Sequence, residues 1–216
     1  MDFTALQTRV RNRLNMSTDD PVEDLVDEYV NEGLHVVDMA NPTGWPWLYA
    51  TANFTTTTNQ ESYGFSAIVN SSSITVWKLA DVRVRSGDVF DPLTLVSAEE
   101  GNYLWPTVAQ GFPQAYFVEG ETLYIRPIPN GAYGTRVRYV KAEQDMVAGT
   151  DGPLMPARYH GAIVTAALVI FYETLQDTQR LAMEQTRLDS WVQRMWRSSD
   201  ETVEIPRVRV RDSMVF

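Results

Sequence analysis

The amino-acid sequence predicts an α+β protein in which a helical bundle, built from both ends of the chain, carries an inserted antiparallel β-rich domain. Apolar residues recur at helical spacing near both ends, short β-prone runs fill the middle, and a strictly alternating segment follows the last helix. We expect the bundle to comprise residues 1–44 and 153–198, the β-rich insert residues 45–152, and an extended C-terminal arm residues 199–216.

The first predicted helix spans residues 2–15. Its apolar residues recur every three or four positions and therefore share one face, which comprises Phe3, Leu6, Val10 and Leu14. The arginines between them, Arg9, Arg11 and Arg13, are expected to be exposed.

The second predicted helix has Asp20 as its N-cap and Pro21 at its first helical position, and it ends near Ala40. Its buried stripe is expected to comprise Val22, Leu25, Val26, Tyr29, Val30, Leu34 and Val37. The helix is strongly acidic, and no Lys or Arg occurs between Arg13 and Lys78. The first carboxylates favour the positive end of the helix dipole, whereas the later ones need solvent or a functional surface.

Residues 45–144 are predicted to be β-rich, with turn-forming Gly, Asn, Pro and Ser clusters between the strands. The β-prone runs are Ala50–Thr58, Tyr63–Val69, Ile74–Val84, Ala115–Val118, Thr122–Pro127 and Thr135–Lys141. Glu119-Gly120-Glu121 is typical of a hairpin connection. Ser97-Ala-Glu-Glu100 matches a capping box and predicts a short helix toward Leu104.

Two helices are predicted after the β-rich region. Pro156 is expected to open the first of them, which runs to about Leu175 and is apolar on nearly all sides, so that it should lie at the centre of the bundle. The second, residues 178–197, has one apolar stripe. Trp196 lies partly off this stripe and is expected to be exposed or to contact a neighbouring subunit.

The segment that follows Pro206 alternates strictly, with Val208 and Val210 on one side and Arg207, Arg209 and Arg211 on the other. This is the periodicity of a β-strand. Three interpretations remain open: a frayed terminus, a strand that pairs with its own sheet, or a strand added to a neighbouring subunit.

Composition limits the function classes. The net charge of -10 opposes sequence-independent wrapping of DNA. The absence of cysteine excludes disulfides, thiolate metal sites and cysteine nucleophiles. The N-terminus lacks the apolar core of a signal peptide, and the longest apolar stretch, Ala162–Tyr172, is too short to cross a bilayer. We expect a soluble cytoplasmic product without a membrane partner.

No motif indicates a reactive centre, and we expect no catalytic residue, cofactor or metal. His35 and His160 lie in different predicted helices without metal-ligand spacing, and His160 is expected to make a hydrogen bond near its helix start. Carboxylates at the loops of the β-rich region are expected to be solvated; they are Asp88, Asp91, Glu99 and Glu100. A hydrolase with an unrecognised carboxylate pair is one alternative function.

The Trp45-Pro46-Trp47 sequence allows two interpretations. The rings either stack on a carbohydrate or a base, or they anchor a helical layer to a sheet, and we favour the second. A non-catalytic β-domain module that recognises carbohydrate or a host surface through Trp45, Trp47 or Trp105 is a further alternative function.

An ordered set of motifs runs through residues 5–197. The N-terminal motifs are Arg9-Val-Arg-Asn-Arg-Leu14, Tyr29-Val-Asn-Glu-Gly-Leu34 and Trp45-Pro-Trp-Leu48. The later motifs are Phe90-Asp-Pro-Leu-Thr-Leu-Val-Ser-Ala-Glu-Glu100, Gly111-Phe-Pro-Gln-Ala-Tyr116, Glu119-Gly-Glu-Thr-Leu-Tyr-Ile-Arg-Pro-Ile-Pro129, Val137-Arg-Tyr139 and Leu154-Met-Pro-Ala-Arg-Tyr-His160. In this order they resemble the head-tail adaptor (connector) proteins of tailed bacteriophages.

The resemblance implies a non-enzymatic structural protein of the virion neck that is made in the host cytoplasm. Its subunits are expected to form a ring, commonly of twelve, that docks under the portal protein and extends the DNA channel. The ring would also offer a docking surface to a downstream tail or stopper protein. DNA would pass through it without sequence-specific binding.

The resemblance also gives candidate sites. Basic residues are expected to contact the portal or neighbouring copies; with the valines between them they are Arg9, Arg13, Arg207, Val208, Arg209, Val210 and Arg211. Acidic residues of the second helix are candidates for the channel lining, because they repel DNA phosphate; they are Glu23, Asp27, Glu28 and Glu32. The acidic loops of the β-rich region are a second candidate lining.

Overall fold

The computed structural model contains two compact units, which we describe separately. The helical unit comprises Met1–Trp47 and Asp145–Phe216, and the β unit comprises Leu48–Gln144. Helices and largely antiparallel sheets together confirm the predicted α+β class. The residues that the structure describes are 1–16, 25–70, 74–105 and 109–201.

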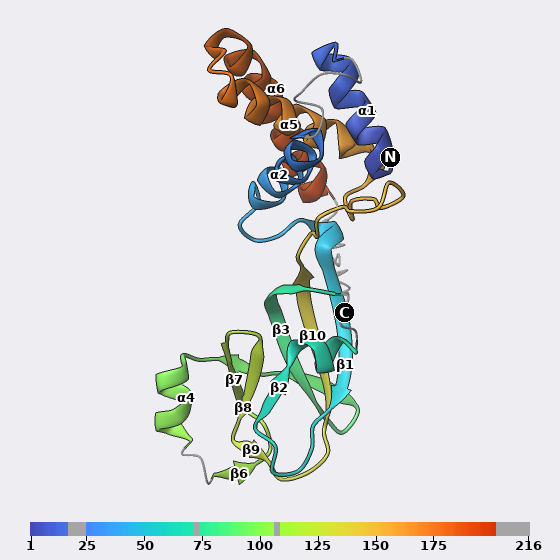
Figure 1. The fold of residues 1–216 in the computed structure, drawn as a ribbon. Coiled ribbons are helices and arrows are strands. Elements are labelled where there is room, and N and C mark those ends of the chain that lie inside the picture. Colours follow the sequence, from blue (N-terminus) through green and yellow to red (C-terminus); the bar gives the residue numbers. More distant parts are fainter. Residues whose placement is uncertain (17–24, 71–73, 106–108, 202–216) are drawn as a thin grey trace, which may run out of the picture. The chain divides into compact units, whose positions relative to one another are not determined.

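Four α-helices form the described part of the helical unit: α1 (Phe3–Leu14), α2 (Val26–Met39), α5 (His160–Thr174) and α6 (Thr178–Glu201). Figure 1 shows α5 among the other three, and α5 contacts each of them. Every residue from Ala162 to Leu168 is buried, as expected for a helix that is apolar on nearly all sides. Two 3-10 turns, η2 (Pro46–Leu48) and η3 (Ala157–Tyr159), precede β1 and α5.

The helices α2 and α5 approach each other closely at Gly33. A Cβ atom at this position would lie 2.8 Å from the Ala167 nitrogen and 2.9 Å from the Ile163 oxygen. Both neighbours are backbone atoms that cannot move aside. Glycine is therefore required at this crossing, and the side chains on either side of it, Val30 and Val37, are fully buried.

Details of the predicted helices differ from the structure. The predicted N-cap at Asp20 and the following Pro21 and Val22 lie outside the described residues, and α2 begins at Val26. Leu25 was expected in the buried stripe but is 38% exposed, because it precedes the first turn. Pro156 precedes the η3 turn rather than α5 itself, which begins at His160.

The first sheet of the β unit is antiparallel throughout, with strand order β1-β10-β3-β4. Its strands are β1 (Tyr49–Thr55), β10 (Gly134–Lys141), β3 (Val76–Ser86) and β4 (Val89–Pro92). The register pairs Tyr49 with Val140 and Val137 with Val82, and it shifts after Arg138 and after Val140. Buried residues alternate along β10 as they do in a half-buried strand.

The second sheet has the order β2-β8-β7-β5, and a separate two-stranded sheet pairs β6 with β9. These strands are β2 (Ser62–Gly64), β8 (Thr122–Arg126), β7 (Ala115–Glu119), β5 (Thr94–Leu95), β6 (Gln110–Gly111) and β9 (Ile128–Pro129). The predicted Glu119–Glu121 hairpin joins β7 to β8. The β5–β7 and β6–β9 pairs are parallel, so the insert is not purely antiparallel. A shared apolar core includes Ile125, Leu123, Val82 and Val137.

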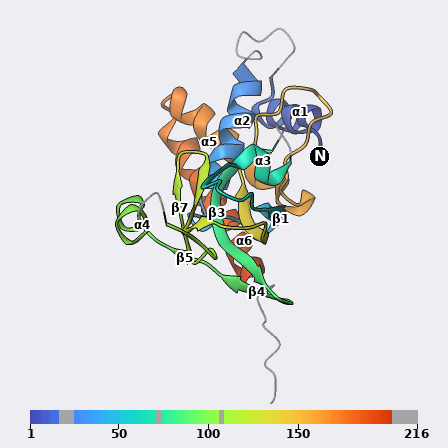
Figure 2. The ribbon, with the colours of Figure 1, turned by 90° about the horizontal axis from the view of Figure 1, so that it is seen from below.

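Two short helices accompany these strands. The run Tyr63–Val69 was predicted as a strand but becomes helix α3 (Phe65–Val69) after Gly64, because Phe65 and Ile68 bury their side chains at helical spacing. The predicted capping box is the start of α4 (Ala98–Leu104), whose Glu100 nitrogen donates to the Ser97 hydroxyl. Figure 2 shows α4 at the margin of the β unit.

The loop of residues 145–152, which the sequence assigned to the β-rich insert, groups with the helices. Its backbone accepts hydrogen bonds at Asp151 from Phe3 (2.7 Å) and at Gly149 from Thr4 (3.1 Å). The Asn31 amide both donates to and accepts from the backbone of Met146. At the other end, α6 continues through Glu201, so that the first residues of the predicted arm are helical.

Candidate functional site

Helix α1 presents Arg9 and Arg13 one turn apart on the same flank. Its buried residues, Phe3, Leu6 and Val10, hold the opposite side against the other helices. The Asp2 carboxylate accepts a hydrogen bond from the Ala5 nitrogen (2.9 Å) and caps the helix start. Both arginines are exposed, as the sequence predicted.

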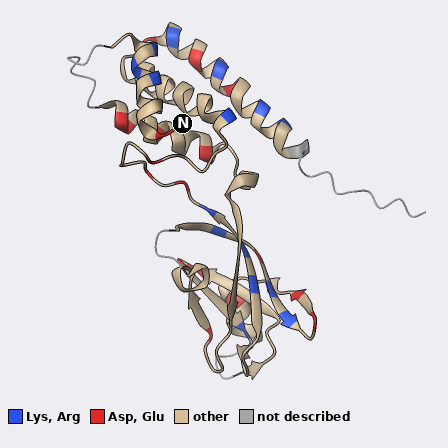
Figure 3. Ribbon diagram, turned by 90° about the vertical axis from the view of Figure 1, so that its right-hand side faces the viewer, with Lys and Arg blue, Asp and Glu red and all other residues tan. Residues whose placement is uncertain are grey.

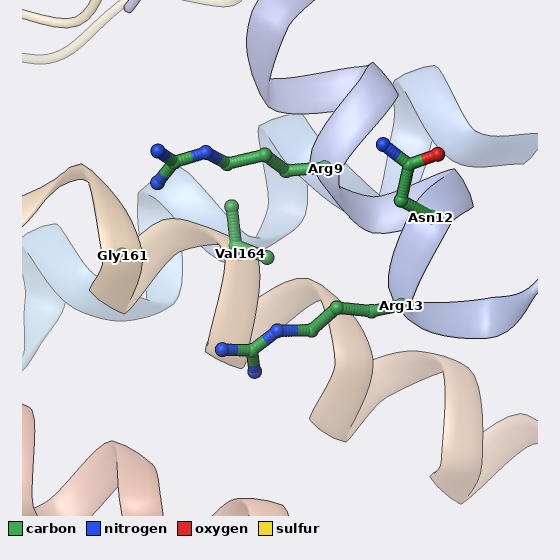
Figure 4. A pocket seen from close by; sticks show the side chains of 5 residues that line it. All are labelled: Arg9, Asn12, Arg13, Gly161 and Val164. Carbon is green, nitrogen blue, oxygen red and sulfur yellow. The ribbon is translucent and has the colours of Figure 1, made fainter.

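A basic groove lies beside this flank of α1. One pocket of about 330 Å³ is lined by Arg9, Asn12 and Arg13 of α1 and by Gly161 and Val164 of α5. In Figure 4 the side chains of Arg9 and Arg13 extend from α1 to the same side, with Val164 between them. A second pocket of about 370 Å³ shares Arg13 and continues onto α6. We call these two pockets together the basic groove.

Helix α6 supplies the other wall of the basic groove. Its lining residues are Thr186, Arg187, Ser190, Trp191 and Arg194. Figure 3 shows Lys and Arg positions recurring along this helix. Sequence reasoning missed this wall, although Arg180, Arg187 and Arg194 recur every seven residues and therefore lie along one face of a helix.

Glu184 is a carboxylate of α6 that pairs with two arginines of the groove. It is only 7% exposed. Its side chain forms ion pairs with Arg187 on its own helix and with Arg13 of α1, the latter at 3.7 Å. Burying a carboxylate is costly unless cations compensate it, and the two guanidinium groups do so here. Arg13 and Arg187 are thus partly neutralised within the chain.

Trp191 gives the basic groove an aromatic wall. A Cβ atom at Gly161 would lie 2.7 Å from the Trp191 ring, so the indole lies directly on the α5 backbone. The Arg194 guanidinium lies 5.2 Å from the centre of the same ring, a cation–π geometry. An arginine held beside a partly buried aromatic ring is a residue combination that protein interfaces favour.

The remaining predicted site residues do not join the groove. Asp27, Glu28 and Glu32 are exposed on α2, and the Gln7 amide donates to the Asp27 carboxylate. Glu23 and the C-terminal residues lie outside the described part of the chain; the latter are Arg207, Val208, Arg209, Val210 and Arg211.

The two histidines lie apart within the helical unit. His160 is buried at the start of α5, where one ring nitrogen contacts the Met155 oxygen and the other the Met1 amine, each at 2.9 Å. The predicted hydrogen bond near the helix start is therefore confirmed. His35 contacts the Asp145 carboxylate at 2.7 Å. No group of three His, Asp or Glu residues that could hold a metal ion occurs among the described residues.

The tryptophans of the junction are used for packing. Trp45 is fully buried, donates from its indole nitrogen to the Val37 oxygen (3.0 Å), and stacks on Trp47 at 5.1 Å. Trp196 was expected to be exposed or to contact a neighbouring subunit. It is half-buried, with its ring 5.4 Å from that of Trp45, and a contact with a neighbour stays a prediction. Tyr159 covers Trp47 from a further side. Trp45 is thus closed to a carbohydrate, whereas Trp47 and Trp105 are half-buried.

Comparison with known proteins adds the family. The model of the SU10 adaptor protein family matches residues 1–211, which is nearly the whole chain. The chain belongs to the SU10 adaptor protein family. This adaptor is therefore a phage structural protein, and its family implies contact with other proteins of the virion. The matched region includes the alternating segment up to Arg211.

No curated protein matches the adaptor. None of the adaptor's described helices has the length and apolar character needed to cross a membrane.

Proposed function

We propose that this adaptor forms a ring below the portal protein, extends the DNA channel, and provides a docking surface for a downstream tail or stopper protein. The observation that carries the proposal is the family match over residues 1–211. The basic groove supports it further, because an arginine-rich surface with one buried carboxylate suits contacts with an acidic protein partner.

The channel itself is proposed to be lined by carboxylates, so that DNA slides without adhering. One candidate lining is the exposed acidic face of α2, with Asp27, Glu28 and Glu32. The other is the set of acidic loops of the β unit, which includes Asp88, Asp91, Glu119 and Glu121, all exposed.

Binding to the portal tests this function directly. Purified adaptor is mixed with the portal protein of the same phage, and the complex is imaged by electron microscopy. We expect a ring of adaptor subunits on one face of the portal ring, and we expect the adaptor in purified virions at the neck. An adaptor that is absent from virions and does not bind the portal would overturn the proposal.

The C-terminal arm is proposed to reach the portal or a neighbouring copy by strand addition. A chain that ends at Glu201, the last residue of α6, should keep the thermal unfolding of the full chain but bind the portal more weakly. Circular dichroism checks the first expectation and co-sedimentation the second. Equal portal binding by the truncated and full chains would remove the arm from the interface.

A further inference from the structure

We infer that the basic groove of one adaptor copy receives the acidic face of α2 of a neighbouring copy. The inference rests on the proposed ring, and it names the two surfaces that would join the subunits. It is carried by the charges of the groove and of α2, and by the different flanks that α1 turns toward them.

The basic groove retains cationic charge that no carboxylate in the described part of the chain neutralises. Glu184 forms ion pairs with Arg13 and Arg187, but Arg9 and Arg194 form none with any carboxylate in the described part of the chain. Arg194 instead contacts the Ser190 hydroxyl and the Trp191 ring. An anionic partner would therefore find, on opposite walls, two guanidinium groups that pair with no carboxylate of the described residues.

The outward face of α2 has an excess of negative charge, which complements the positive charge of the groove. Glu28 and Glu32 are exposed one helical turn apart, and neither forms an ion pair within residues 1–16, 25–70, 74–105 and 109–201. The sequence offers them no local partner, because no Lys or Arg occurs between Arg13 and Lys78. These carboxylates are available to a cation from another chain.

Helix α1 turns one flank toward α2 and another toward the groove. The flank of α1 that carries Gln7 contacts α2 through Asp27. The flank that carries Arg9 and Arg13 borders α5 and the groove (Figure 4). Two different, complementary surfaces on one subunit give a head-to-tail contact, which is the kind that closes a ring.

The spacing of the charges also matches. Arg9 and Arg13 are four residues apart on α1, and so are Glu28 and Glu32 on α2. Side chains at this spacing start about 5–6 Å apart on a helix surface. A neighbouring α2 can thus place one carboxylate over Arg9 and the other over Arg13, whose charge Glu184 neutralises only in part.

A second copy fits the groove better than DNA does. The chain has a net charge of -10, so a DNA phosphate approaches against overall repulsion, whereas α2 concentrates that negative charge where it can face the arginines. If the groove of a neighbouring copy covers α2, the acidic loops of the β unit remain as the candidate lining of the DNA channel.

Charge reversal tests the contact. Arg9→Glu/Arg194→Glu and Glu28→Arg/Glu32→Arg each place like charges together. In a mixture, every contact between one variant and the other again pairs opposite charges. Arg13 and Arg187 are left unchanged because Glu184 needs them. The control, Glu173→Arg/Asp189→Arg, reverses two exposed carboxylates on α5 and α6 that line neither pocket of the groove. Association on the portal is measured at low and high salt by sedimentation and electron microscopy.

We expect each groove or α2 variant to associate roughly tenfold more weakly than the wild type, and the mixture to recover part of the loss. Full assembly of both variants would overturn the inference while leaving the ring itself intact. Reduced binding of duplex DNA with unchanged assembly would overturn it in favour of a nucleic-acid surface. A wild-type adaptor that never binds the portal would instead contradict the proposed function.

Cysteine cross-linking gives a second measurement that does not depend on charge. The chain has no cysteine, so Arg9→Cys in one preparation and Glu28→Cys in another introduce the only thiols. A short bis-maleimide should join the two preparations when both are assembled on the portal. Dimers formed equally by the Ser66→Cys control, whose site is exposed on α3, would show that the link is unspecific.

Discussion

His160 shows how one buried side chain responds to its surroundings. Burial lowers the pKa of the imidazole, the Met155 carbonyl opposes this, and the Met1 amine and Arg9 lower the pKa further. The geometry fits a neutral ring whose Nε2–H donates to Met155 and whose Nδ1 accepts from Met1. The folded adaptor therefore resists protonation at this position.

This shift predicts a loss of stability in acid. An unfolded histidine titrates near 6.5, above the lowered pKa in the folded chain, so the unfolded state binds more protons as the pH falls through that value. The free energy of unfolding contributed by His160 is present above this pH and declines below it. This contribution is isolated by measuring the free energy of urea unfolding between pH 8 and pH 5.5 for His35→Gln and for His35→Gln/His160→Gln. Equal pH slopes would contradict the assignment.

Replacing Gly33 with alanine should destabilise the chain, although the same replacement usually stabilises a helix. Alanine in place of a helical glycine normally stabilises by roughly 0.5–1 kcal/mol. Here the added methyl meets backbone atoms of α5 at 2.8 and 2.9 Å. We expect Gly33→Ala to destabilise by about 1–3 kcal/mol, the usual cost of overpacking.

Chemical denaturation measures the effect of Gly33→Ala. Gly64→Ala is the control, because the nearest atom to its added Cβ, the Ser66 hydroxyl oxygen, lies 4.0 Å away and its φ of -64° suits alanine. A variant at Gly33 that is as stable as the control would show that α2 and α5 do not approach as described.

The stability of helix α4 depends on its N-cap residue, Ser97. It has seven residues, buries only Gly101, and leaves Tyr103 and Leu104 exposed. Packing therefore contributes little to it, and a helix this short is marginal by itself. The hydrogen bond from the Glu100 nitrogen to Ser97 accordingly matters more here than in the long helices.

Removing this cap should act locally. We expect Ser97→Ala to cost about 1 kcal/mol and to speed amide hydrogen exchange within α4 while the exchange in β7 changes little. Ser66→Ala, at an exposed position of α3, is the matched control. Uniform acceleration across the β unit would mean that α4 and the sheet open together.

The chain enters and leaves the β unit through two neighbouring strands. The chain enters the β unit at β1 and leaves it at β10, and Tyr49 pairs with Val140 at that end of the ladder. The start and end of the insert are thus adjacent in space. Such an arrangement lets an inserted unit close its own sheets without strands from outside.

We therefore expect residues 48–144 to fold when produced alone. The apolar core of this unit is formed from its own strands and from α3, and it includes Tyr116 and Leu93. Near-ultraviolet circular dichroism and a cooperative urea transition would report a packed domain. A fragment that remains unfolded would show that the helical unit is required for its stability.

The sequence by itself determined the elements that have strong apolar periodicity or clear capping and turn residues. The apolar run of α5 predicted a central helix, and Ser97 and the Glu119–Glu121 turn predicted a cap and a hairpin. It failed at Tyr63–Val69, where a short apolar run carries no information that separates strand from helix. A local pattern therefore predicts an element only where it fits one kind of secondary structure and not the other.

Only the tertiary structure decided which side chains meet. Arg9 and Arg13 were candidates from the sequence, but Arg187, Trp191 and Arg194 join them because α5 brings α1 and α6 together. Trp196 looked exposed by its position on the helix, yet Trp45 covers it from more than one hundred residues away along the chain. Helical spacing fixes the face on which a residue lies, whereas the partner of that face depends on contacts between distant segments that periodicity does not encode.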